Sequence, residues 1–127
     1  MLETFALITL LAIHDGDTFS VNVGGLPPII GQNIRIRMRD IDAPELTSKN
    51  KCEAKKAIDA RDFLRKKITN KKIILKNVWR DKYFRLLADV EVDGILINSE
   101  MIKQKLAIPY DSISRKKIDW CRYGYND

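Results

Sequence analysis

The chain has 127 residues, of which 45% are hydrophobic and 31% charged, as in a soluble protein with one compact core. Its formal net charge of +6 favours a polyanionic partner such as nucleic acid, although many basic domains bind nothing anionic. A zinc site is disfavoured, because His14 is the only histidine and the two cysteines, Cys52 and Cys121, form no CxxC motif. The cysteines allow either a disulfide, which would indicate an oxidising compartment, or two free thiols.

The first apolar segment, FALITLLAI at residues 5–13, predicts a buried strand. It lacks the basic leading region and the cleavage site of a signal peptide, and it is too short to cross a membrane. Residues 15–23, DGDTFSVNV, predict a tight Asp-Gly turn into a second strand. The glycines and prolines of residues 24–33, GGLPPIIGQN, predict a loop.

Arginines and apolar residues alternate along residues 34–41, IRIRMRDI. The two-residue period predicts a third strand with one apolar and one cationic face. Pro44 follows closely and ends the strand, since proline supplies no N–H to a sheet. The apolar face would hold Ile34, Ile36 and Met38, and the cationic face Arg35, Arg37 and Arg39.

Residues 53–68 predict a helix, with acidic residues leading and basic residues trailing. Its apolar face would hold Ala57, Ala60, Leu64 and Ile68.

Residues 71–79 and 85–92 predict a fourth and a fifth strand, and Asp93-Gly94 predicts a hairpin turn into a short strand. Asn98 is expected to cap a short helix over residues 99–107. From Pro109 onward the sequence predicts no clear element.

This order of elements predicts a single domain over residues 1–127 that is mainly β with some α structure. Five antiparallel strands, with a helix after the third strand and a short helix after the fifth, favour a small closed Greek-key barrel.

Carboxylates gather in two of the predicted strand-end turns. Barrel closure could bring these turns together, and oxygen ligands without sulfur or imidazole select a hard divalent cation such as Ca²⁺ or Mg²⁺. Aspartate and glycine are also common in turns for backbone reasons alone. Arg37 on the adjoining strand adds a guanidinium, which suits phosphoryl chemistry. The carboxylates are Asp15, Asp17, Asp42 and Glu45.

Five motifs together resemble the staphylococcal nuclease (thermonuclease) family, in the same order over about residues 5–110. They are HDGDTFSV, RMRDIDAPE, EAKKAIDARDFL, DKYFRLLADVEVDG and IKQKLA. The resemblance implies an oligonucleotide/oligosaccharide-binding (OB) barrel and calcium-dependent hydrolysis of DNA and RNA. It further implies a preference for single-stranded or frayed substrates, little sequence specificity, a 3′-phosphate product and a monomer.

The resemblance also implies roles for individual residues at the cation. Asp17 and Asp42 would bind one Ca²⁺ ion, together with the backbone carbonyl of Ala43. Asp15 and Thr18 would support these ligands from behind.

Further residues would act on the substrate. Arg37 would bind the phosphate, Glu45 would hold and deprotonate the attacking water, and Arg85 would lie toward the leaving oxygen. Substrate contacts would come from Lys82 and Tyr83, and from Tyr110 as the counterpart of base-packing tyrosines.

The chain departs from the family pattern in four places. Phe84 stands where the family commonly has glycine, which bears on the aim of the following Arg85. The loop at residues 24–33 is longer, and the segment between the helix and the fourth strand is shorter. The C-terminal part is also short, so that a third helix of the family would be mostly missing.

Two alternatives to a nuclease remain open. One is a catalytically inactive OB-barrel module that binds nucleic acid or protein, and the other is a structural domain with basic solvated faces. Neither alternative needs five catalytic and metal-binding side chains to be retained together. These are Asp17, Arg37, Asp42, Glu45 and Arg85. A secreted or periplasmic location is favoured over a cytoplasmic one.

Overall fold

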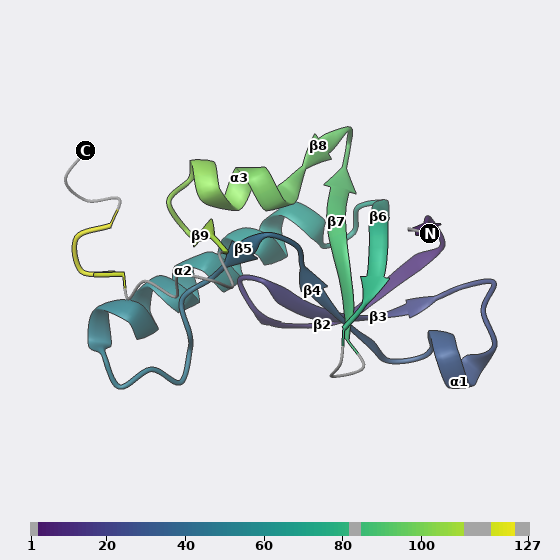
Figure 1. The fold of residues 1–127 in the computed structure, drawn as a ribbon, viewed down its shortest axis with the longest axis horizontal. Coiled ribbons are helices and arrows are strands. Elements are labelled where there is room, and N and C mark those ends of the chain that lie inside the picture. Colours follow the sequence, from purple (N-terminus) through teal and green to yellow (C-terminus); the bar gives the residue numbers. More distant parts are fainter. Residues whose placement is uncertain (1–2, 82–84, 111–117, 124–127) are drawn as a thin grey trace.

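The computed structural model describes residues 3–81, 85–110 and 118–123 (Figure 1). These residues form three helices and nine strands. The helices are α1 (Pro28–Gly31), α2 (Lys51–Ile68) and α3 (Ile97–Lys103). The strands are β1 (Glu3–Phe5), β2 (Ile8–Asp15), β3 (Thr18–Val23), β4 (Ile34–Met38), β5 (Ile41–Asp42), β6 (Ile73–Arg80), β7 (Leu86–Val92), β8 (Ile95–Leu96) and β9 (Ile108–Pro109).

The main sheet has the order β1-β6-β7-β4-β3-β2, with β8 paired to β7. Because β1 and β2 follow each other in the chain, the first segment of the protein reaches both ends of this order. The predicted fold class is confirmed: the structure is dominated by strands with a few helices, consistent with an OB barrel. The expectation that all strands are antiparallel is wrong, because β4 and β7 are parallel. The chain returns beside β4 in the same direction after crossing over through α2 and β6.

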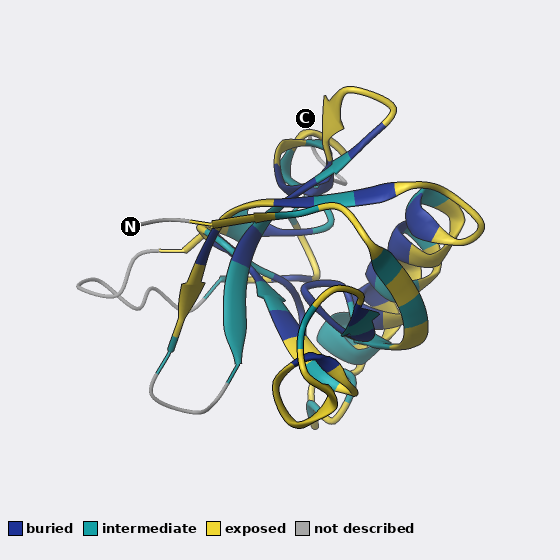
Figure 2. Ribbon diagram, turned by 90° about the vertical axis from the view of Figure 1, so that its right-hand side faces the viewer, coloured by how far each residue is buried: buried dark blue, intermediate teal, exposed yellow. Residues whose placement is uncertain are grey.

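The core lies between the strands and α2 (Figure 2). The predicted alternation along β4 is confirmed, since Ile36 and Met38 are buried and Arg35 is exposed. The predicted apolar face of α2 is also buried. This helix begins two residues earlier than expected, because the side chain of Asn50 accepts a hydrogen bond from the backbone N–H of Glu53 and caps it.

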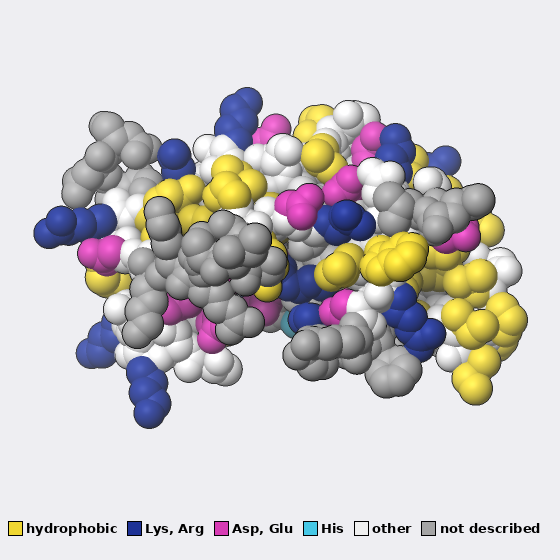
Figure 3. Space-filling view, in the orientation of Figure 1, with side chains coloured by type: hydrophobic (Ala, Val, Ile, Leu, Met, Phe, Trp, Pro, Cys, Tyr) yellow, Lys and Arg dark blue, Asp and Glu magenta, His cyan; other side chains and the backbone are white. Residues whose placement is uncertain are grey.

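The first apolar segment is not the buried strand that its composition predicts. It is divided into β1 and β2. Leu7, between the two strands, is 68% exposed, and Leu11, within β2, is 47% exposed. The loop after β3 contains the single turn α1, which Pro28 opens with its preset φ. Ile29 in this turn is 92% exposed, and Figure 3 shows hydrophobic side chains gathered on the surface at this end of the molecule.

Asn98 is not the N-cap that the sequence predicts. Helix α3 begins two residues earlier than predicted, at Ile97, and the Asn98 side chain turns inward, where it is buried. Its Oδ1 accepts a hydrogen bond from the N–H of Val90 (2.8 Å), and its Nδ2 donates to the carbonyls of Arg39 (3.0 Å) and Ala88 (3.2 Å). Asn98 therefore joins α3 to β7 and to the turn after β4.

The chain after α3 is fastened at two places. The short strand β9, which the sequence did not predict, pairs with β5. Cys52 and Cys121 form a disulfide, and the neighbouring Trp120 is buried. Lys56 of α2 donates a hydrogen bond of 2.6 Å to the carbonyl of Tyr123.

In the described part of the chain, no helix is both long and apolar enough to span a membrane.

Candidate active site

A cavity of about 680 Å³ opens where β3, β4, β5 and the start of β7 meet. It collects every predicted site residue that the structure describes. Lys82 and Tyr83 lie outside the described residues, as does Phe84. The predicted residues that line the cavity are Asp15, Asp17, Thr18, Arg37, Asp42, Ala43, Glu45, Arg85 and Tyr110.

The turn between β2 and β3 brings the first two carboxylates to this cavity. The backbone N–H of Asp17 donates to Oδ1 of Asp15 at 3.0 Å, which fixes the turn. Gly16 lies against α2, and a Cβ atom at this position would come within 2.7 Å of the Cβ of Ala60. The Asp-Gly-Asp sequence therefore serves both the turn and close packing on the helix.

Asp17 is the buried centre of the site. Its Oδ1 accepts a hydrogen bond from the hydroxyl of Thr18 (2.8 Å), and its Oδ2 accepts one from the N–H of Ala43 (2.8 Å). Burial, assisted by a hydrogen bond to Asp15, raises the pKa of Asp17 to about 7, although Arg37 and the N–H of Ala43 oppose the shift. The fold thus holds a carboxylate that is costly to ionise in the absence of more positive charge.

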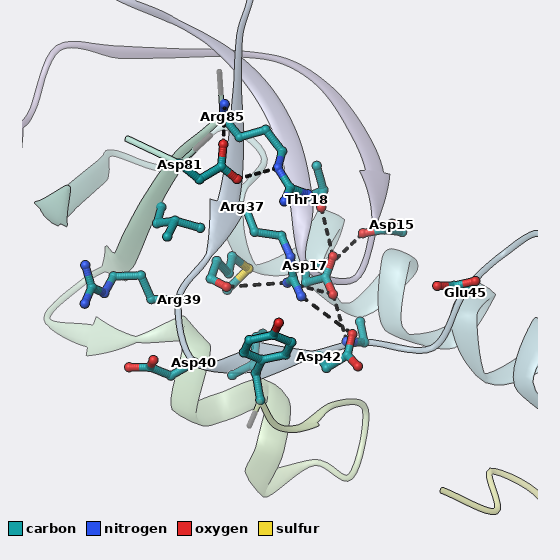
Figure 4. A pocket seen from close by; sticks show the side chains of 15 residues that line it. Asp15, Asp17, Thr18, Arg37, Arg39, Asp40, Asp42, Glu45, Asp81 and Arg85 are labelled. Atoms are coloured by element: carbon teal, nitrogen blue, oxygen red, sulfur yellow. Dashed lines mark hydrogen bonds and ion pairs between the residues drawn. The ribbon is translucent and has the colours of Figure 1, made fainter. Parts of the chain in front are cut away.

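Arg37 links the two expected cation ligands. Its Nη1 lies 2.8 Å from Oδ2 of Asp17, and its Nη2 lies 3.6 Å from Oδ1 of Asp42 (Figure 4). The turn between β4 and β5, with Asp40 at a φ of +61°, brings Asp42 back toward Arg37. The guanidinium carbon is 5.9 Å from the centre of the Tyr110 ring, within the range of a cation–π contact.

Glu45 lines the same cavity from the loop before α2, and Figure 4 shows its carboxylate apart from the group around Arg37. The N–H of Glu45 donates to Oε2 of Glu53 at 3.0 Å, and the hydroxyl of Ser48 donates to Oε1 of the same side chain at 2.9 Å. Glu53, in the first turn of α2, therefore holds the loop that carries Glu45. Its role was not predicted.

Arg85 is held by Asp81, which was also not predicted. The backbone N–H and the Nε of Arg85 donate to the two carboxylate oxygens of Asp81, at 2.9 Å and 2.8 Å. The N–H of Asp81 donates in return to the carbonyl of Arg85 (2.9 Å). The signal in the sequence was a carboxylate four residues before an arginine, in the segment between β6 and β7.

Two further lining residues, Arg39 and Asp40, were not assigned to the site from the sequence. Figure 4 shows Arg39 pointing away from the carboxylates around Asp17. Its Nη1 donates to the carbonyl of Asn77 in β6 at 3.0 Å. The cationic face of β4 therefore continues from the cavity toward β6.

The donor atoms at the cavity fit a hard cation. Asp17 and Asp42 both approach one guanidinium, and Ala43 lines the same cavity. Carboxylate and carbonyl oxygens suit Ca²⁺. A cation would also relieve the cost of ionising the buried Asp17. Among the described residues no group of three or more histidine, cysteine, aspartate or glutamate side chains is arranged as a metal site.

Comparison with known proteins agrees with the motifs. The model of the family described as "Staphylococcal nuclease homologue" matches residues 35–122. An uncharacterized endonuclease of Haemophilus influenzae is 31% identical over 109 residues, which cover 86% of this chain and 55% of the relative. Endonuclease YncB of Bacillus subtilis is 33% identical over 103 residues (79% and 46%). An SPbeta prophage-derived endonuclease of the same species, YokF, is 35% identical over 104 residues (79% and 33%). The chain spans about half the length, or less, of these relatives.

Proposed function

We propose, from the premise that this chain belongs to the staphylococcal nuclease family, that it is a calcium-dependent nuclease hydrolysing phosphodiester bonds of DNA and RNA. The observation that carries the proposal is that one cavity is lined by Arg37, by Arg85 and by carboxylates in two separate places. Asp17 and Asp42 lie beside Arg37, while Glu45 stands apart on a braced loop.

Arg37 acts as the phosphate clamp. Its guanidinium lies at the junction of two carboxylates and is mostly buried, with 15% of the side chain exposed. A planar fork in this position grips two phosphate oxygens, and poor solvation strengthens the contact. Removing one such donor from a transition state typically costs ~3 kcal/mol.

Arg85 provides the second positive charge at the cavity. The negative charge on the phosphoryl group increases from the ground state to the transition state, so a second fixed cation favours the transition state. Asp81 restrains the guanidinium of Arg85 through its Nε. This bond leaves the orientation of Arg85 fixed before substrate binds.

Glu45 orients and deprotonates the attacking water. The residue is exposed and lines the cavity, so its carboxylate can reach a water there and accept its proton. The water oxygen forms a bond to phosphorus while the bond from phosphorus to the 5′ oxygen breaks. The 5′ oxygen then takes a proton from solvent, and the products carry a 3′-phosphate and a 5′-hydroxyl.

Asp17, Asp42 and the carbonyl of Ala43 would hold one Ca²⁺ ion, which would supply further neutralisation of the phosphate. Asp15 and Thr18 support this group by fixing the turn and the carboxylate of Asp17. Lys82 and Tyr83, beyond the described residues, and Tyr110 would contact the nucleotide.

The site also supports proposals on substrate and location. The cavity holds charged groups that suit a backbone phosphate, so we expect little sequence specificity. We further expect a preference for single-stranded or frayed substrates, and a protein that acts as a monomer. The disulfide between Cys52 and Cys121 supports action outside the cytoplasm, in an oxidising compartment.

The proposal is tested by hydrolysis of denatured DNA at mildly alkaline pH, with millimolar Ca²⁺ against EDTA. The wild type is compared with Arg37→Ala and Glu45→Ala, and with Arg65→Ala as a matched control on the exposed face of α2. Cleavage should need calcium, fall at least about 100-fold in the first two variants, and persist in the control. DNA binding without cleavage under any divalent cation would instead identify the inactive binding module.

A further inference from the structure

An exposed tryptophan lies close to the candidate active site. Trp79, near the end of β6, has 51% of its surface exposed, whereas the other tryptophan, Trp120, is 6% exposed. A single exposed apolar residue is common on protein surfaces. Trp79 is unusual because an irregularity in β6 turns it outward and places it in line with Arg37.

A β-bulge turns Trp79 outward. Lys76 lies opposite Asp89 and Trp79 opposite Leu87, so β6 advances three residues while β7 advances two. Strict alternation from the exposed Lys76 would point residue 78 outward and residue 79 into the core. Instead Val78 is buried and Trp79 is exposed. The extra residue therefore exchanges the faces of these two side chains, which is a recognised use of bulges beside active sites.

The bulge is fixed by specific bonds. Asn77 adopts a φ of +52°, and its Nδ2 donates to Oδ2 of Asp89 at 2.7 Å. Its carbonyl accepts the hydrogen bond from Nη1 of Arg39, which lines the cavity. The residue that turns Trp79 outward is thus tied directly to the cationic face of β4.

Trp79 continues a row of residues that begins at Arg37. Leu87 lies opposite Arg37 on one side and opposite Trp79 on the other. Residues that lie opposite each other project from the same face of a sheet, and adjacent strands are ~4.8 Å apart, so the main chain at Trp79 is ~10 Å from that at Arg37. Figure 3 shows hydrophobic and cationic side chains side by side over this part of the molecule.

We propose that Trp79 stacks on a base of single-stranded nucleic acid whose neighbouring phosphate is held at Arg37, with Leu87 between the two residues. This inference rests on the proposed function and deepens it. An aromatic face beside a cationic groove binds single strands with little regard to sequence, because every base has a π face. Trp79 is a binding residue here and takes no part in the chemistry.

Fluorescence tests the contact directly. Single-stranded oligothymidylate is titrated, with Ca²⁺ present, into the Glu45→Gln variant, which binds without cutting under the proposed function. The strand should quench the exposed Trp79, while the buried Trp120 serves as internal reference. In the same variant carrying Trp79→Phe, the quenching should disappear while binding, followed by anisotropy of a labelled strand, persists.

Kinetics separate this inference from the proposed function. Trp79→Ala should raise KM for oligothymidylate about 5- to 100-fold with kcat unchanged. Trp79→Phe and the exposed control Ile30→Ala should stay near the wild type. On an abasic strand that keeps a base only at the cleaved nucleotide, Trp79→Ala and wild type should have equal KM.

Two results would overturn the inference. In the first, the wild type cuts but Trp79→Ala binds and cuts like Ile30→Ala. The proposed nuclease function would then be retained and the stacking contact rejected, and the exposed Trp79 would be a candidate contact for a protein partner. If the wild type neither binds nor cuts single strands, both the proposed function and the stacking contact fail.

Discussion

Nη1 of Arg37 lies 2.8 Å from Oδ2 of Asp17, so the expected phosphate clamp and an expected cation ligand are paired with each other. Each offsets part of the cost of burying the other, but for Asp17 the cost of burial outweighs the attraction of Arg37, because its pKa is raised. A cation at Asp17 would replace the charge of Arg37, and a phosphate at Arg37 would replace that of Asp17. Binding of the two ligands is therefore expected to be mutually favourable.

The first prediction concerns Asp17→Asn and pH. The folded-state pKa of about 7 exceeds the ordinary value of 3.8, so the folded protein binds the proton more tightly than the unfolded chain does. The contribution of Asp17 to the free energy of unfolding of the metal-free protein should therefore be highest below about pH 4. It should fall as the pH rises to about 7. Asp17→Asn removes this decline.

Urea unfolding in EDTA at pH 5 and pH 8 measures the effect. Relative to wild type, Asp17→Asn should gain up to a few kcal/mol at the higher pH. The exposed Asp62→Asn serves as the matched control. Parallel pH profiles for Asp17→Asn and wild type would show that Asp17 is ionised at no cost.

The second prediction concerns Asp81→Asn. The asparagine amide keeps only one of the two acceptor oxygens that hold the backbone N–H and the Nε of Arg85, and it lacks the negative charge. Arg85 is then less well oriented, so kcat on denatured DNA should fall about 10-fold or more. Arg85→Ala should fall further, and the double variant should match Arg85→Ala alone if Asp81 contributes to catalysis through Arg85. Additive losses in the double variant would assign Asp81 a separate role.

The third prediction concerns Asn98→Ala. This change removes the partner of the Val90 N–H and of two main-chain carbonyls, and buried groups left unpaired cost about 1–3 kcal/mol each. The free energy of unfolding should fall by about 2–4 kcal/mol. Ser99→Ala, on the exposed side of α3, should change it by less than about 0.5 kcal/mol. Equal unfolding midpoints for the two variants would contradict the assigned bonds.

The fourth prediction concerns the disulfide. The bridge joins residues 69 apart in sequence, and closing a loop of that length stabilises by about 4 kcal/mol through the unfolded state. The double variant Cys52→Ser/Cys121→Ser should lose about this much in denaturant unfolding. Wild type in reducing agent should behave like the variant. Mass spectrometry that finds two free thiols in unreduced protein would rule the bridge out.

Local patterns in the sequence predicted those parts of the fold that short-range rules govern. The alternation of arginines with Ile36 and Met38 predicted the faces of β4, and the spacing of Ala57, Ala60, Leu64 and Ile68 predicted the buried face of α2. The carboxylate turns and the motif order placed nine site residues in one cavity. Their roles in catalysis stay predictions.

The features that the sequence did not predict depend on contacts between distant segments. Asparagine is a common helix N-cap, yet the Asn98 side chain is buried, because it bonds to three main-chain groups of β7 and of the turn after β4. The parallel pairing of β4 with β7 follows from a crossover, and β9 exists only because β5 lies beside it. The outward turn of Trp79 depends on a bulge that strand periodicity alone cannot reveal.

The disulfide gives the chain a covalent ring. Residues 52–121 form a closed loop that contains Arg85 and Tyr110, while Asp17, Arg37, Asp42 and Glu45 precede it. A protease cut at the exposed Asp93-Gly94 turn would leave a nicked molecule whose two pieces part only on reduction. One piece would keep every candidate catalytic residue, and the other would remain attached through the Cys52–Cys121 bond. This turn is therefore where a tag or a new terminus can be introduced without dividing the catalytic residues between fragments.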